Sequence, residues 1–234
     1  MTNELRVMTS GAFTAAHFKL IAEVEELTSK KIITVTTSIG TGESSIPNRL
    51  RRGEVADVVI VADTLLKEFM KEQWVLDEGF QVVASSVIGI AVREGAPKPD
   101  LSSVESFKQF LLAAQSVAYS ASVSGQYLLN EIYPRLGIES QMLPKSRLIT
   151  GGERTGTIVA RGEAQVCCQQ ISEMLPIQGI AHITTLPEAL QKKSFFAAGI
   201  GSHCTDKRAA LQMIQFLTSA QAAPTIRQTG LEPI

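Results

Sequence analysis

The chain has 234 residues, of which 44% are hydrophobic and 19% are charged, a composition that excludes a fibrous or disordered protein. Its 22 basic and 23 acidic residues leave a net charge of -1, and the densest basic cluster is Arg49–Arg52. This balance argues against a nucleic-acid or membrane-surface partner, because both usually require a basic excess or stripe. We interpret the arginine cluster as a solvated helix face rather than a phosphate contact.

The length of the chain allows one large domain or two lobes of about 100 residues each. No apolar run reaches the roughly 18 residues that a bilayer-spanning helix needs. The N-terminus enters a predicted strand at once, without the apolar stretch of a secretory signal, so the chain as written is predicted to be cytoplasmic. A chain whose native leader had been removed would look the same and would be periplasmic. Cys167, Cys168 and Cys204 fit neither a disulfide framework nor a zinc spacing, and no metal site is predicted.

The first third of the chain alternates strand and helix patterns. Predicted strands cover 5–8, 32–36 and 57–61, with predicted helices between and after them up to residue 72. The first helix has a predicted apolar face made of Phe13, His17, Leu20, Ile21, Val24 and Leu27. The second is indicated by Ser44 or Ser45 as its cap and by Pro47 in its first turn. This alternation predicts a parallel sheet.

Extended segments at 82–83 and 87–92 are predicted to carry the chain into a second lobe. There, Ser102 and Glu105 form a predicted capping box for a helix that ends near Leu112. Further predicted strands cover 116–119, 147–150 and 165–170, and predicted helices cover 126–136 and 155–161. A strand at 194–198 and helices at 209–217 and 220–228 are predicted to return to the first lobe. The predicted lobes are therefore residues 1–83 with 195–234, and residues 84–194.

Four times, a predicted strand leads into a loop of small polar residues that opens a helix. The loops are Met8–Ala12, Gly40–Ser45, Ser120–Gly125 and Thr150–Thr155. A helix start offers unpaired N–H groups and a partial positive charge, and Gly or Ser allows an anion to approach the backbone closely. Four converging loops would form an anion site to which each predicted lobe contributes half.

Several segments together carry a family resemblance. They are Arg49–Val59, Gly95–Asp100, Ala160–Ala164, Gln169–Glu173 and Gly230–Pro233. With these segments and its order of strands and loops, the chain resembles the bacterial family 11 extracellular solute-binding proteins, which include the periplasmic molybdate-binding proteins. The resemblance implies an α/β fold of the type 2 periplasmic-binding-protein class. Such a fold has two lobes, each a mainly parallel sheet flanked by helices, with a ligand cleft between the lobes.

The same resemblance implies a set of ligand-binding residues in the four loops and one residue after them. The set is Ser10, Gly11, Ala12, Thr41, Gly42, Ser122, Ser124, Gly125, Arg154, Thr155 and Gln169. Two features depart from the molybdate proteins: the second loop is longer, and Arg154 stands where a small or apolar residue is expected. A guanidinium favours planar carboxylates through paired hydrogen bonds, so the predicted ligand is a small organic polycarboxylate.

The branch of the family that the chain resembles also includes aconitate isomerase. This resemblance implies a shift of the double bond of an aconitate-type tricarboxylate, with no cofactor. The reaction needs a base for an allylic proton and donors for the charge that develops on a carboxylate. Candidates for the base are His17, Glu43 and Cys168. Each has a structural alternative: a core histidine, a solvated or capping carboxylate, and a packed thiol.

Two other functions stay open. The chain could be the substrate-binding component of an ABC importer for a carboxylate or a molybdate-like oxyanion, with an ABC permease as its partner if a signal peptide was removed. It could also be a ligand-sensing module without chemistry. In every case the predicted partner is a small anion.

Overall fold

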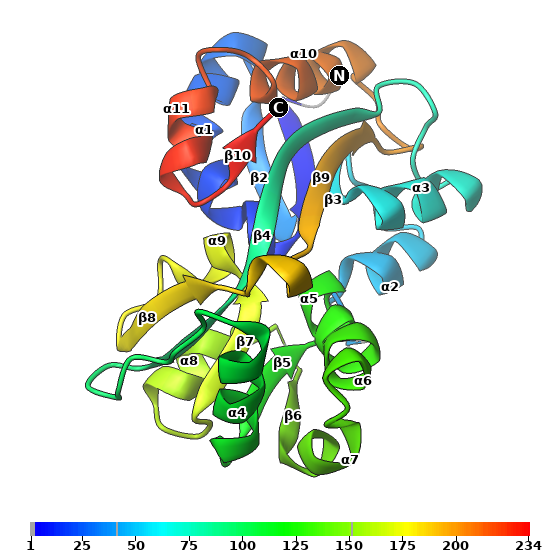
Figure 1. Cartoon of the computed structure of the whole chain (residues 1–234). Helices are drawn as coiled ribbons and strands as arrows, with labels where there is room; N and C mark the ends of the chain where they lie inside the picture. Colours follow the sequence, from blue (N-terminus) through cyan, green and yellow to red (C-terminus); the bar gives the residue numbers. More distant parts are fainter. Residues whose placement is uncertain (1–2, 41, 151) are drawn as a thin grey trace. The chain divides into compact units, whose positions relative to one another are not determined.

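A computed structural model describes residues 3–40, 42–150 and 152–234 (Figure 1). The chain divides into two units. The first contains the residues up to Ser86 together with Phe195–Ile234, and the second contains Val87–Ser194. Strands β4 (Gln81–Arg93) and β9 (Lys193–Ile200) each include one of the two crossing points. The sequence predicted two short extended segments where β4 forms one long strand.

The first unit is built on a mixed sheet. Its remaining strands are β1 (Glu4–Thr9), β2 (Lys31–Thr36), β3 (Val58–Ala62) and β10 (Glu232–Pro233). Strand β1 pairs in parallel with β2 and with β3, as a strand–helix–strand order requires. Strand β9 runs antiparallel to β3, and β10 runs antiparallel to β4. The returning C-terminal segment therefore supplies the antiparallel part of this sheet.

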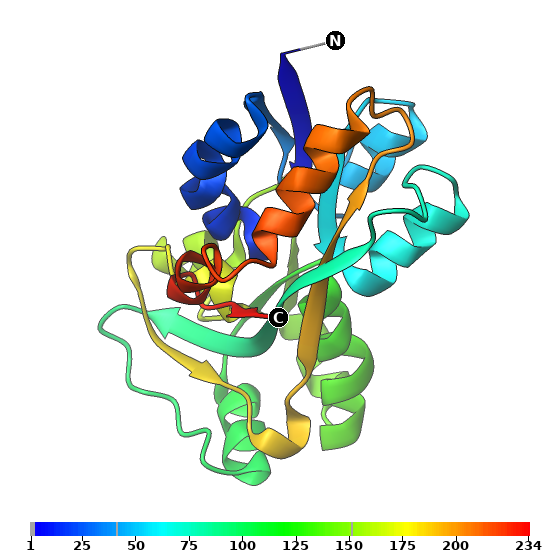
Figure 2. The ribbon, with the colours of Figure 1, turned by 90° about the horizontal axis from the view of Figure 1, so that it is seen from above.

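Helices cover both faces of this sheet. They are α1 (Gly11–Thr28), α2 (Ile46–Arg51), α3 (Asp63–Lys71), α10 (Lys207–Leu217) and α11 (Ala223–Gln228). Figure 1 shows α1, α10 and α11 on one side and α2 and α3 on the other. In Figure 2, α1 and α10 lie side by side. Val59 and Val61 of β3 pack with Leu66 and Phe69 of α3. Because side chains alternate between the two faces of a strand, these two valines lie on the same face of the sheet.

The apolar face of α1 follows the predicted spacing for most of its length. Phe13, His17, Leu20 and Val24 are buried. The prediction is wrong for Leu27, which is 47% exposed. The helix ends at Thr28, which is buried in place of Leu27, and Ser29 follows in the left-handed conformation with φ 53°. The buried face passes from Val24 to Thr28, four residues on, so Leu27 lies beside this face and is exposed.

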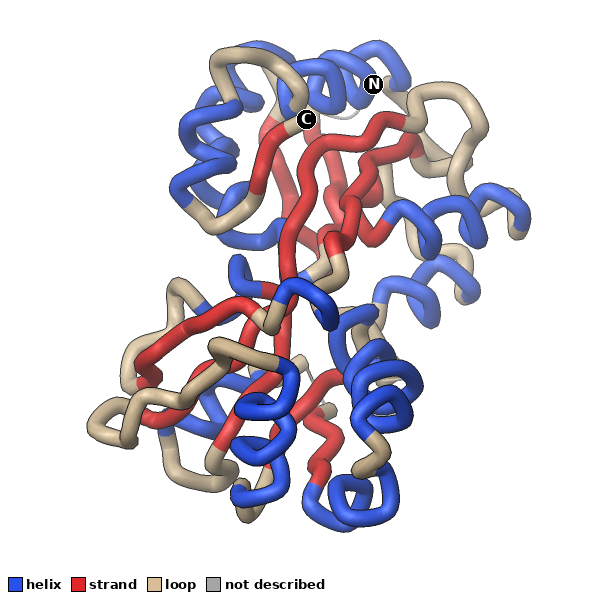
Figure 3. Tube along the Cα trace, viewed as in Figure 1, coloured by secondary structure: helices blue, strands red, loops and turns tan. Residues whose placement is uncertain are grey.

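The second unit contains another mixed sheet, in the order β4-β7-β5-β6, with β8 on the other edge of β4. Its further strands are β5 (Val117–Ser120), β6 (Ser146–Ile149), β7 (Val166–Gln170) and β8 (Ile180–Thr185). Strand β5 runs parallel to β6 and β7, while β4 runs antiparallel to β7 and β8. Strand β8 was not predicted from the sequence. The alternation of strands and helices in each unit is visible in Figure 3.

Helices of the second unit are short. They are α4 (Val104–Ala113), α5 (Val123–Tyr127), α6 (Tyr133–Leu136), α7 (Glu139–Met142), α8 (Thr155–Ala160) and α9 (Ile171–Met174). A π-helical turn at Leu128–Ile132 joins α5 to α6, and 3-10 turns lie at Leu143–Lys145 and Glu188–Leu190. The cap of α4 is Ser103, whose hydroxyl accepts from the Ser106 N–H at 3.0 Å. The predicted capping box, Ser102 with Glu105, is therefore wrong by one residue.

Candidate functional site

The first loop places Ser10 at the start of α1. The Ser10 N–H donates to the Ile60 carbonyl at 2.7 Å, and the Ser10 carbonyl accepts from the Phe13 N–H and the Thr14 hydroxyl. The Ser10 hydroxyl is buried and has no hydrogen-bond partner among the described residues. Gly11 and Ala12 form the first turn of α1. A buried hydroxyl without a partner is costly in an empty protein and is available to a ligand.

Arginine side chains hold the second loop through hydrogen bonds to its backbone carbonyls. Thr41 lies outside the described residues. The Gly42 carbonyl accepts from the Ser45 N–H, while the carbonyls of Ser44 and Glu43 accept from Arg49 Nε at 3.0 Å and Arg52 Nη2 at 2.9 Å. The arginine cluster therefore has a structural role in holding this loop. Ser45, which the sequence singled out only as a cap, is buried, and its hydroxyl has no hydrogen-bond partner in the part of the chain that the structure describes.

The Glu43 side chain is exposed, in contrast to the environment that would tune a catalytic carboxylate. Its backbone carbonyl is the atom that Arg52 contacts. Nothing in the described part of the chain shields the carboxylate from water. The exposure of Glu43 fits a solvated carboxylate better than a catalytic base.

The third loop contains a chain of serine hydroxyls. Ser120 Oγ lies 2.8 Å from Ser122 Oγ, which lies 3.0 Å from Ser124 Oγ. Gly125 is buried at the start of α5, and a Cβ atom there would lie 1.8 Å from the Ser120 carbonyl oxygen. Only glycine allows the helix to begin so close to β5. The three hydroxyls can reorient together, so the loop can present either a donor or an acceptor.

The fourth loop places Arg154 directly before α8. The side chain is half-buried, and within the described ranges its guanidinium has no hydrogen bond or ion pair. Its acidic neighbour Glu153 is engaged elsewhere, because Arg161 pairs with Glu153 and with Glu163. Arg154 therefore makes no salt bridge among the described residues, and buried polar groups lie beside it.

Those buried groups are Thr155 and Gln169, the other two predicted site residues of this unit. The Thr155 hydroxyl donates to Gln169 Oε1, and both side chains are at most 3% exposed. Thr155 opens α8, and Gln169 lies on strand β7. The structure thus brings together Arg154, Thr155 and Gln169 at one end of β7.

Glu173 belongs to the same cluster and was not predicted. It is 7% exposed, in the short helix α9 that follows β7. Burial raises the pKa of Glu173 to about 7, although the charge of Arg154 and hydrogen bonds from Gln169 and the Gln170 backbone lower it. The sequence held no distinctive signal for this residue, because an acidic side chain in the first turn of a helix is common.

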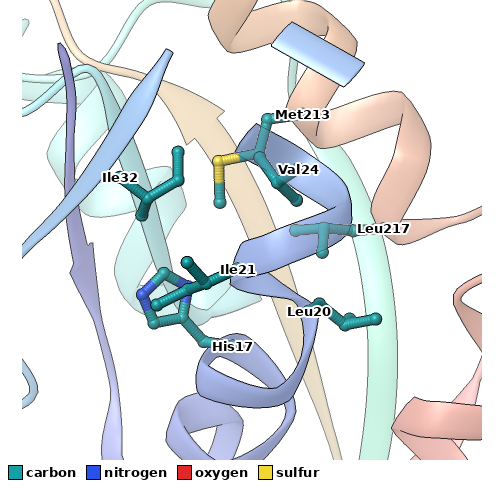
Figure 4. A pocket seen from close by; sticks show the side chains of 7 residues that line it. All are labelled: His17, Leu20, Ile21, Val24, Ile32, Met213 and Leu217. Carbon is teal, nitrogen blue, oxygen red and sulfur yellow. The ribbon is translucent and has the colours of Figure 1, made fainter. Parts of the chain in front are cut away.

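His17 lies within helix α1 of the first unit, outside the two predicted loops of that unit. Its Nε2 lies 2.8 Å from Thr34 Oγ1, and burial lowers the pKa of His17 to about 4. Figure 4 shows the ring among apolar side chains of α1, β2 and α10. These residues are Leu20, Ile21, Val24, Ile32, Met213 and Leu217, and they leave no space for a water molecule. The surroundings are those of a core histidine.

Cys168 packs inside the second unit, in a cluster with Ile90, Phe107 and Tyr133. Burial raises the pKa of its thiol far above the ordinary value. Its neighbour Cys167 faces a different cluster with Ile158 and Met174, and burial raises its pKa to about 12. Neither thiol is placed to form a reactive thiolate. Within the described ranges, no group of three or more His, Cys, Asp and Glu side chains could hold a metal ion.

Comparison with known proteins defines the class. The chain belongs to the bacterial extracellular solute-binding protein family, which matches residues 5–232. It is 37% identical to an aconitate isomerase from a Pseudomonas species over 231 residues, 98% of this chain and 88% of the relative. None of the helices that the structure describes is long and apolar enough to cross a membrane.

Solved structures show the fold. The periplasmic molybdate-binding protein of Azotobacter vinelandii matches with a TM-score of 0.77 at 15% identity, over 97% of this chain and 98% of that one. Peb3 from Campylobacter jejuni matches with a TM-score of 0.71 at 11% identity, over 98% and 99%. The predicted α/β periplasmic-binding-protein fold is confirmed, although its sheets are mixed and not mainly parallel as predicted, because β4, β9 and β10 pair antiparallel with their neighbours.

Proposed function

We propose that this protein isomerises a small polycarboxylate of the aconitate type by moving its carbon–carbon double bond to the neighbouring position. The observation that carries the proposal is the half-buried Arg154, which makes no salt bridge among the described residues and directly precedes Thr155 of the buried pair Thr155–Gln169. A guanidinium beside neutral donors suits a carboxylate, because two parallel N–H···O bonds match its plane.

The proposed binding residues lie in both units. In the first they are Ser10, Gly11, Ala12, Thr41 and Gly42, and in the second Ser122, Ser124, Gly125, Arg154, Thr155 and Gln169. The unpartnered Ser10 hydroxyl and the connected hydroxyls of Ser122 and Ser124 support this assignment. A substrate with three carboxylates needs several hydrogen-bond donors. Arg154 can bind one of these carboxylates, and the loop residues would bind the other two.

The chemistry requires no cofactor. A base removes the allylic proton, the electron pair shifts into the conjugated system, and a proton is added at the far allylic carbon. Negative charge grows on one carboxylate in the transition state, where fixed donors stabilise it. The 37% identity to an aconitate isomerase over nearly the whole chain supports this reaction over other uses of a carboxylate site.

The test is incubation of the purified protein with trans-aconitate, followed by ultraviolet absorbance of the conjugated double bond. We expect an absorbance change whose initial rate is proportional to protein concentration and saturates with substrate. A protein heated until it unfolds is the matched control. If calorimetry shows saturable binding of trans-aconitate and the absorbance does not change, the isomerase proposal is wrong and the protein only binds this ligand.

The second candidate is a substrate-binding component of an ABC importer, which the family assignment favours. Its ligand would be a carboxylate or a molybdate-like oxyanion. Calorimetry with molybdate and with trans-aconitate separates these ligands. Arg154 favours the carboxylate, so tighter binding of molybdate would support the importer reading.

A further inference from the structure

The proposed reaction needs a base, and the three candidates that the sequence suggests are poorly placed. His17 is hydrogen-bonded to Thr34 among apolar side chains, Glu43 is exposed, and Cys168 is packed in the core. A base for an allylic carbon acid must be shielded from water and must lie beside the group that binds the substrate. Another residue has to supply it.

Glu173 meets both requirements. It is 7% exposed, and the Arg154 charge acts on it. Glu173 lies four residues after Gln169, whose side chain accepts a hydrogen bond from Thr155, and both Gln169 and Arg154 act on its pKa, so Glu173 belongs to the cluster that contains three proposed binding residues. Two further buried polar atoms close to it in sequence, Gln170 Oε1 and Ser172 Oγ, have no partner among the described residues. A ligand carboxylate can accept a hydrogen bond from the Ser172 hydroxyl, whereas Gln170 Oε1 is an acceptor and needs a donor.

Resting on the proposed function, we propose that Glu173 is the catalytic acid–base residue, which removes the allylic proton and returns one to the far allylic carbon. In the first half-reaction a C–H bond of the substrate methylene breaks and an O–H bond forms on the Glu173 carboxylate. The C–H electron pair enters the conjugated carboxylate system. In the second half-reaction that O–H bond breaks and a new C–H bond forms, so the carboxylate is regenerated with no change in oxidation state.

The surroundings of Glu173 set the pH at which it acts. Helix α9 packs on β7 and β8. On β7 the titratable groups are the thiols of Cys167 and Cys168, which burial keeps neutral, and on β8 His182 is exposed. Arg154 before α8 is the cation that acts on Glu173. With its pKa raised to about 7, Glu173 is a stronger base than an ordinary glutamate and is still ionised in part at neutral pH.

A capping role is the structural alternative, since Glu173 occupies the third position of α9 and hydrogen-bonds to the Gln170 backbone. Kinetics separate the two roles. For Glu173→Gln we expect kcat with trans-aconitate to fall by about 100-fold or more and KM to change by less than about threefold. A cap alone would move the melting temperature and leave kcat close to the wild-type value.

The control is Glu131→Gln, which changes an exposed carboxylate of the same unit and should keep wild-type kinetics. Wild-type kcat/KM should rise with pH up to about pH 7, because the base must be ionised. The pH profile of the wild-type protein tests the role of Glu173 as the base even if Glu173→Gln fails to fold. A kcat/KM that does not change with pH around neutrality overturns this role. Turnover by a folded Glu173→Gln at the wild-type rate overturns it too and leaves the proposed function intact. A wild-type protein without turnover overturns the proposed function.

Discussion

Arg154 is the residue on which ligand choice depends. It makes no salt bridge among the described residues, since its neighbour Glu153 pairs with Arg161, although its charge acts on Glu173. We expect Arg154→Ala to weaken trans-aconitate binding by about 2 to 5 kcal/mol, the range for a desolvated charge pair that loses one member. Calorimetric titration measures this directly. Arg147→Ala, which alters an exposed arginine of the same unit, is the control, and equal affinities of the two variants would remove Arg154 from the site.

His17 makes a separate prediction about stability. Burial lowers the pKa of His17 to about 4, whereas an unfolded histidine titrates near its ordinary value of 6.5. Between these values the unfolded chain binds a proton that the folded chain does not, so stability falls as the pH drops through this window. The total loss by pH 4 amounts to about 3 kcal/mol.

The measurement is urea unfolding at several pH values between pH 7 and pH 4. His17→Gln removes the titration, and its stability should depend less steeply on pH. His203→Gln, at an exposed histidine, should follow the wild type. If His17→Gln and the wild type lose stability in parallel, another group causes the acid sensitivity.

At the scale of elements, Gly125 sets how closely α5 approaches β5. Gly125→Ala would place a Cβ atom 1.8 Å from the Ser120 carbonyl oxygen, so the helix start must shift. We expect a loss of about 1 to 3 kcal/mol in the free energy of unfolding, as for other overpacked sites. Gly42→Ala meets open space and should cost far less in the same urea titration. If Gly125→Ala and Gly42→Ala have equal free energies of unfolding, α5 can shift away from β5 without a cost in stability.

The cap of α4 gives a second prediction at this scale. Ser103→Ala removes the acceptor for the Ser106 N–H and should lower the free energy of unfolding by about 1 kcal/mol. Ser102→Ala retains this cap and should cost less. A larger effect at Ser102 would restore the capping box that the sequence predicted.

These elements also show what the sequence could predict. Strand–helix alternation located the parallel strands, because an amphipathic helix between two apolar runs has few other arrangements. The antiparallel direction of β9 depends on contacts with β3, which lies far away in the chain, and local patterns do not contain that information. Ser102 and Ser103 compete for one cap, and the backbone geometry of the turn decides between them.

The candidate site shows the same division. Motifs pointed to Arg154, Thr155 and Gln169, and the structure brings these three together. The environment of Glu173 could not be predicted, because its burial and the effect of Arg154 come from tertiary packing, whereas a packed Cys168 thiol was one of the two alternatives that the sequence offered. Thr41 lies outside the described residues, and its proposed role stays a prediction.

At the scale of the whole molecule, ligand binding should stabilise the fold. A ligand that binds only the folded state at about 100 times its Kd adds about 2.7 kcal/mol. We expect trans-aconitate to raise the melting temperature by roughly 5 to 10 °C, measured by scanning calorimetry. Sulfate at the same concentration is the control. An equal shift with both anions would indicate binding of charge without recognition of the carboxylates.

Proton NMR of the purified protein mixed in separate tubes with cis-aconitate and with trans-aconitate tests the central claim most directly. The account predicts that both tubes reach the same final ratio of isomers, at rates that scale with protein concentration and fall in Arg154→Ala. Unchanged spectra of both isomers at stoichiometric protein would contradict it.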